Sequence, residues 1–230
     1  MAMPTMIPVY LEGGGQRTFA SAIDWPGWSR AGRGEAEALD ALVAYGPRYA
    51  DVIRRTSLEL TPPADASALE VVERLNGGSA TDFGVPSLPC ARDAEPMDHA
   101  ERERQIVVLE ASWAAFDDAG TAASSLVLRK GPRGGGRDLD KIRLHVLQAE
   151  LSYLTKLGSQ RPKAVMEDIA TQMSQVRVAM LDVLRARARG EPVADPNRVA
   201  TPWTPRYFVR RAAWHVLDHA WEIEDRAEPA

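Results

Sequence analysis

Short apolar runs that are broken by glycine and proline occupy the chain up to about residue 90. Residues 9–12 and 18–23 alternate in polarity on either side of three glycines, and this pattern predicts a β-hairpin. A third short strand is expected at residues 28–32, after Pro26-Gly27. The pattern then predicts a helix at residues 34–53, which is bent where Gly46-Pro47 interrupts it. Two more strands are expected at residues 57–60 and 68–75.

Beyond residue 95 the pattern changes to long stretches with the period of an amphipathic helix. Residues 77–96, which separate the two hydrophobicity patterns, are rich in glycine, proline and small polar residues and are interpreted as a linker. Asp138 and Thr204 are the expected N-caps of two of the later helices. The predicted helices span residues 97–119, 138–157, 163–189 and 206–227, with Gly120, Gly158 and Gly190 as stop signals for the first three.

These four predicted helices suggest how the second half folds. Each holds about twenty residues and would be roughly 30 Å long. Four amphipathic helices of this length, with mostly modest connections, are most simply an up-down four-helix bundle. The 230 residues are enough for two small domains. We therefore expect an α+β domain at residues 1–90, followed by an all-α four-helix bundle at residues 91–230.

Composition excludes several classes of protein. Apolar residues make up 45% of the chain and charged residues 26%, which is the profile of a globular protein. The net charge of −4 argues against a broad basic surface for nucleic acid. No run of eighteen apolar residues is present, so no membrane span is expected. The single cysteine, Cys90, excludes an internal disulfide, and we interpret it as a linker thiol. Together these observations predict that the protein resides in a reducing, cytoplasmic compartment.

Two of the four histidines, His215 and His219, lie one helical turn apart in HVLDHAWEIEDR. Residues four apart project from one face of a helix, and these two fall at the edge of its apolar face. His145, in the second long predicted helix, is a third candidate, and three imidazoles with an open position form a known type of catalytic metal site. Spacing alone leaves open the alternative that these are ordinary surface histidines. His99 is expected to lie on the surface.

The order of these histidines also resembles that of the DinB-like family of four-helix-bundle proteins. The resemblance rests on HVLQAE around His145 and on HVLDHAWEI around His215 and His219, and it covers roughly residues 95–228. It implies that the three histidines bind a divalent metal ion, with zinc, nickel, manganese and iron all open. Family members of known activity are mostly metal-dependent transferases or isomerases that act with a low-molecular-weight thiol. The implied partners are therefore a small-molecule thiol and an electrophile.

Four further side chains are candidates for supporting roles at such a site. Glu222 and Asp218 are candidates for orienting the imidazoles from outside the ligand set, and the alternative is a solvated acidic face. Arg133 and Arg137 belong to the glycine-rich stretch GPRGGGRD, which precedes a helix but lacks the features of a phosphate-binding loop. We expect these arginines either to bind a carboxylate of a thiol cofactor or substrate, or to form part of a purely structural loop.

The first half is similar to the HicB-like small domains, whose β-β-β-α unit is a partial RNase H-like fold. The similarity covers roughly residues 7–52. It rests on D-W-P-G-W, on a glycine after the third strand and on an acidic, alanine-rich helix. No helix-turn-helix is evident in the chain. The resemblance therefore implies an interaction or lid module rather than a toxin-neutralising protein.

Two functions follow from these observations. The first is a metal-dependent enzyme, with an S-transferase reaction as the leading expectation and no catalytic residue identified. The alternative is a non-catalytic regulatory or stress-response interaction protein, in which both halves serve as binding surfaces. Trp214 and Trp221 share one helix face and are expected to pack on helix neighbours, on the first half or on a second subunit, so a homodimer is one of the arrangements considered.

Overall fold

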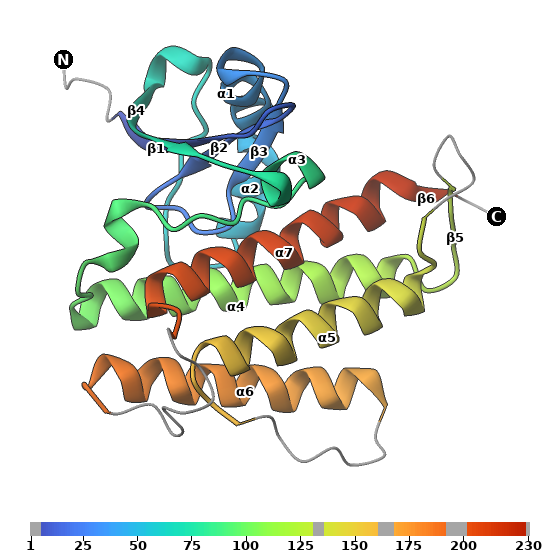
Figure 1. Cartoon of the computed structure of the whole chain (residues 1–230). Coiled ribbons are helices and arrows are strands. Elements are labelled where there is room, and N and C mark those ends of the chain that lie inside the picture. Colours follow the sequence, from blue (N-terminus) through green and yellow to red (C-terminus); the bar gives the residue numbers. More distant parts are fainter. Residues whose placement is uncertain (1–5, 131–135, 161–167, 192–201, 229–230) are drawn as a thin grey trace.

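The computed structural model describes residues 6–130, 136–160, 168–191 and 202–228. Within these residues the chain forms seven α-helices, a four-stranded mixed sheet and a separate two-stranded sheet. Figure 1 shows the four-stranded sheet on one side of four long helices, with α4 and α7 next to it and α6 farthest away. Among the described helices, none combines the length and the apolar composition that a transmembrane span requires.

The four-stranded sheet is built from β1 (Ile7–Gly13), β2 (Thr18–Ala22), β3 (Ser29–Gly32) and β4 (Leu69–Asn76). Its strand order is β3-β2-β1-β4, in which β1 and β2 form the predicted antiparallel hairpin and β4 joins β1 in parallel. The prediction of a further strand at residues 57–60 is wrong, because this segment pairs with no strand and has no regular structure. Leu58 and Leu60 pack at the edge of the core instead.

The first half also contains helices. α1 (Glu35–Ala44) and α2 (Gly46–Ile53) confirm the predicted helix and its interruption. Pro47 lies in the first turn of α2, where a missing N–H breaks no helical hydrogen bond. The predicted linker is more ordered than expected, since it contains α3 (Ser79–Phe83) and the 3₁₀ turn η2 (Ala91–Ala94). Another 3₁₀ turn, η1 (Ala66–Ala68), precedes β4.

The four long helices are α4 (His99–Ala122), α5 (Leu139–Lys156), α6 (Ile169–Ala188) and α7 (Pro205–Arg226). Each follows a residue whose side chain accepts a hydrogen bond from a backbone N–H of the first turn, which satisfies one free donor of the helix end. The capping residues are Asp98, Asp138, Asp168 and Thr204. α5 and α6 end shortly before Gly158 and Gly190, as predicted, whereas α4 continues through Gly120.

The expected division into an α+β domain followed by an all-α four-helix bundle is wrong. The second half contains strands, because β5 (Val127–Leu128) pairs with β6 (Ala227–Glu228) in an antiparallel two-stranded sheet. Strands of two residues show no alternating pattern that a sequence could reveal. These two pair because the C-terminal ends of α4 and α7 lie at the same end of the molecule (Figure 1).

The core also crosses the expected domain boundary. One group of buried side chains lies among the long helices, and a second lies between the sheet, α1, α2 and one face each of α4 and α7. The residues that α4 and α7 contribute to the second group are Val108, Ala111, Ala115, Leu217 and Trp221. Trp214 lies edge-on to Phe19 of β2, with ring centroids 6.2 Å apart. Both tryptophans of α7 therefore pack on the first half of the chain.

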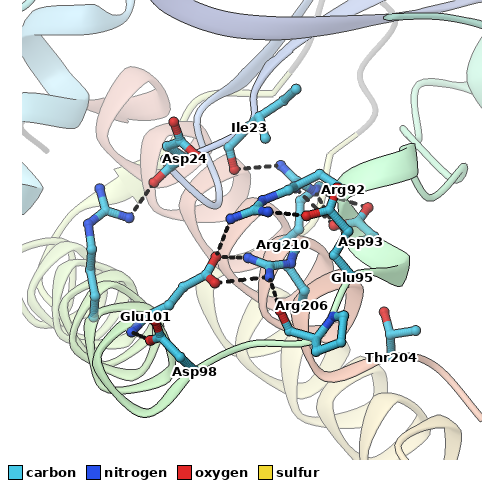
Figure 2. Close-up of polar contacts among 12 residues, drawn as sticks. Ile23, Asp24, Arg92, Asp93, Glu95, Asp98, Glu101, Thr204, Arg206 and Arg210 are labelled. Atoms are coloured by element: carbon cyan, nitrogen blue, oxygen red, sulfur yellow. Dashed lines mark hydrogen bonds and ion pairs between the residues drawn. The ribbon is translucent and has the colours of Figure 1, made fainter.

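A buried ion pair joins η2 to α7 at this boundary, as Figure 2 shows. Arg210 and Asp93 are both buried, and Nη2 of the arginine lies 2.9 Å from Oδ1 of the aspartate. The same guanidinium donates hydrogen bonds to two carbonyl oxygens at the end of β2 and just after it. One turn earlier in α7, Arg206 pairs with Glu101 of α4. These contacts hold together segments that are remote in the sequence.

A second buried ion pair, between Glu150 of α5 and Arg177 of α6, makes stability depend on pH. Glu150 Oε1 lies 3.2 Å from Arg177 Nε, and the carboxyl group is fully buried. Burial raises the pKa of Glu150 from 4.5 to about 7, against the opposing charge of Arg177. Between these values the unfolded chain binds fewer protons than the folded chain. The contribution of Glu150 to stability is therefore lost as pH rises through this interval.

Glu150→Gln is expected to remove this decline, which corresponds to on the order of 3 kcal/mol across the interval. Urea unfolding of both proteins over a pH series that brackets the interval would measure the effect. The difference between the two curves reports Glu150 and the groups coupled to its charge, such as Asp117, because more distant titrating groups contribute to both proteins alike. Curves that run parallel, whatever their offset, would contradict the expectation.

Candidate metal centre

His145 of α5 and His215 and His219 of α7 converge on one point. Each offers one ring nitrogen, and these atoms all lie within 4.8 Å of one another. The Nε2 atoms of His145 and His215 are 3.2 Å apart. The ring centroids of the three imidazoles are separated by 4.7, 5.0 and 5.1 Å. Because His215 and His219 are each 8% exposed and His145 is half-buried, the centre lies just below the surface.

The local sequence explains why these side chains meet. His215 and His219 are four residues apart in α7 and therefore project from one face of the helix. Val146, next to His145 in α5, and Val216, next to His215 in α7, are fully buried in a core that both helices share. The histidines therefore lie at the edge of the contact between α5 and α7.

The environment of the centre favours neutral imidazoles. Burial, assisted by the charge of Arg137, lowers the pKa of His145 below its ordinary value of 6.5. Burial lowers the pKa of His215 well below the same value, and the charges of His219 and His145 act in the same direction. Nδ1 of His215 is buried without a hydrogen-bond partner in the described part of the chain. A neutral imidazole has a free lone pair, so both rings are in the protonation state that binds a metal ion.

Glu222 forms a hydrogen bond with one of the three imidazoles. Its Oε2 lies 2.7 Å from Nδ1 of His219, and its Oε1 pairs with Arg226. The hydrogen bond with His219 is the main reason why the pKa of Glu222 is lowered, and the contact with Arg226 adds to it. With Nδ1 of His219 engaged by a carboxylate, Nε2 is left for a ligand. The contact is the one expected for a residue that orients a metal-binding histidine, and that role stays a prediction.

Of the other predicted supporting residues, Asp218 pairs away from the centre, Arg137 acts on the histidines through its charge, and Arg133 is not described. Asp218 pairs with Arg30 of β3 at 2.8 Å, so its carboxylate joins α7 to the sheet. Arg137 is exposed just before α5, and its carbonyl oxygen accepts a hydrogen bond from Arg226. Arg133 lies outside the described residues.

Two residues that the sequence did not indicate, Tyr153 and Arg211, lie near the histidines. Tyr153 of α5 stands edge-on to His215, with ring centroids 5.8 Å apart, and Trp203 packs against Tyr153. Arg211 of α7 donates a hydrogen bond from Nη2 to the Tyr153 hydroxyl oxygen over 3.3 Å. Arg211 could have been found from its spacing, because it precedes His215 by four residues. The position of Tyr153 against His215 depends on tertiary packing, and no spacing reveals it.

The number and type of donors determine what this centre can do. Three neutral nitrogen donors are a common ligand set of catalytic zinc sites, in which a further position stays open for water or substrate. The DinB-like and HicB-like resemblances stay predictions. Comparisons of the chain with protein-family models, with curated proteins and with solved structures find no match.

Proposed function

We propose that the chain is a divalent-metal-dependent transferase or isomerase that acts with a low-molecular-weight thiol. The proposed metal dependence is supported by the convergence of His145, His215 and His219, whose ligand atoms lie within 4.8 Å of one another. The thiol part follows from the DinB-like resemblance of the two helical segments that contain these histidines. The small-molecule partners would be the thiol and an electrophile.

The residues present fit a divalent ion. In a tetrahedral site with metal–nitrogen bonds of about 2.0–2.1 Å, neighbouring nitrogen atoms lie roughly 3.3 Å apart. The 3.2 Å between the Nε2 atoms of His145 and His215 is close to this separation. Zinc, nickel, manganese and iron are all candidates, because imidazole nitrogen binds each of them. A bound ion would supply Lewis acidity, which lowers the pKa of a thiol or a water molecule.

The chain's own residues have definite tasks in this proposal. His145 and His215 offer lone pairs without first losing a proton. Glu222 holds His219 through Nδ1, and Arg226 holds Glu222 in turn. Contacts of this kind typically change metal affinity by about 10–100-fold. The first half of the chain, which packs on another face of α7, would act as the interaction or lid module that the HicB-like resemblance implies.

Elemental analysis of untagged protein, purified without a chelator, tests the proposal. We expect about one divalent ion per chain, its removal by a chelator, and recovery of occupancy on titration with zinc, nickel, manganese or iron. Assays of thiol transfer to electrophiles would follow on the loaded protein. A chain that holds no ion, even after reconstitution, would overturn the proposal.

A further inference from the structure

Three buried arginines of α7 differ in how their charges are balanced. Arg206 and Arg210 each form an ion pair with a carboxylate, from Glu101 and Asp93 respectively. Arg211 is 8% exposed, yet no carboxylate in the described ranges forms an ion pair with it. A buried charge without an opposite charge is costly, and it persists in proteins where a function requires it.

All the polar contacts of Arg211 in the described part of the chain are with neutral groups. Nη1 donates to the carbonyl oxygen of Pro86 over 2.9 Å, and Nη2 donates to the hydroxyl oxygen of Tyr153 over 3.3 Å. The guanidinium carbon lies 5.7 Å from the ring centre of Tyr153 and 4.8 Å from that of Trp214. These contacts hold the guanidinium in place, while its charge stays available to an anion.

The charge of Arg211 lies close to the candidate metal centre. Arg211 precedes His215 by one turn of α7, and Tyr153, which it contacts, lies against the ring of His215. Among the described residues, the one carboxylate that contacts the histidines is that of Glu222, and it already pairs with Arg226. The centre therefore has an excess of positive charge, and a bound divalent ion would increase it.

We infer that Arg211 and Tyr153 form a binding site for a carboxylate group beside the three histidines. A guanidinium binds a carboxylate through charge-assisted N–H bonds, and the phenol hydroxyl adds a further donor. The inference rests on the proposed function in one respect, namely that the carboxylate belongs to the substrate or thiol that reacts at the centre. Arg211 and Tyr153 position that molecule and thereby restrict the substrate class to carboxylic acids.

Isothermal titration calorimetry at low ionic strength, with succinate and its neutral analogue succinamide, tests the inference. Both ligands would be titrated into metal-free and zinc-loaded protein. We expect metal-free wild type to bind succinate at least about 10-fold more tightly than succinamide. Arg211→Met should abolish this preference, and Tyr153→Phe should reduce it. Equal binding of the two ligands, or an undiminished preference in Arg211→Met, would overturn the inference.

A comparison of neighbouring arginines separates binding from a merely structural role. Arg210→Met leaves Asp93 buried without its partner, so its melting temperature should fall. Arg211→Met removes an unbalanced charge together with two hydrogen bonds to neutral groups, so its melting temperature should fall much less than that of Arg210→Met. A fall as large as that of Arg210→Met would show that Arg211 serves the fold and would contradict the inference.

Metal content decides the proposed function separately. A chain that binds an ion but shows no preference for succinate would refute the carboxylate site and leave the metal proposal intact. A chain that prefers succinate through Arg211 but never holds an ion would refute the metal proposal and support the carboxylate site.

Discussion

Replacing Asp93 with alanine is expected to lower the free energy of unfolding by about 3–5 kcal/mol. The guanidinium of Arg210, which is 4% exposed, would lose the carboxylate that pairs with it. Oδ2 of Asp93 also accepts a hydrogen bond from the backbone N–H of Cys90 over 2.9 Å, so the start of η2 would lose a contact as well. Urea denaturation, followed by circular dichroism, would measure the change.

Two variants serve as controls for this prediction. Glu95→Ala removes an exposed acid two residues further on, which pairs with Arg92 at the surface, and it should change stability by no more than about 1 kcal/mol. The double variant Asp93→Leu/Arg210→Met removes both buried charges and should recover part of the loss. Equal, small losses for Asp93→Ala and Glu95→Ala would show that the buried pair contributes little.

The double variant His215→Ala/His219→Ala is expected to retain no divalent ion under conditions in which the wild type holds about one per chain. It lacks two of the three nitrogen donors, and His145 alone offers a single bond. Elemental analysis after dialysis would measure occupancy. The wild type should also be stabilised by metal, by about 4 kcal/mol when free metal exceeds its Kd 1,000-fold. The variant should show no metal-dependent rise in melting temperature.

His99→Ala is the matched control for the metal prediction. His99 is exposed at the start of α4, as the sequence predicted, and it belongs to no histidine cluster in the described residues. This variant should keep both the ion and the metal-dependent rise in melting temperature. If instead the double variant retained the ion as the wild type does, the metal would bind elsewhere, and the centre at His145, His215 and His219 would be refuted.

Local features of the structure were readable from the sequence. Asp138 and Thr204 cap their helices as predicted, because capping depends on a side chain and a backbone group only three residues apart. The hairpin of β1 and β2 and the break between α1 and α2 are likewise local. The strand predicted at residues 57–60 failed for a physical reason, since a strand forms only where a neighbouring strand accepts its hydrogen bonds.

The candidate site likewise combines features that helical spacing determines with features that tertiary packing determines. Helical spacing by itself determined that His215 and His219 share one face of α7, and that Arg211 lies one turn before them. Only the tertiary structure brought His145 to them across the contact between α5 and α7. It also turned Asp218 towards Arg30 and left Arg211 without a carboxylate partner in the described ranges.

The fold shows most clearly which features the sequence determines and which depend on tertiary contacts. The sequence determined where most helices and strands begin and end, because hydrophobic period, capping residues and glycine breaks act over a few neighbouring residues. The tertiary structure decided that α4 and α7 each have two buried faces, that the core crosses residue 90, and that β5 pairs with β6. Those outcomes depend on which surfaces meet across long separations in the chain, and the period of a single helix carries no information about its partners.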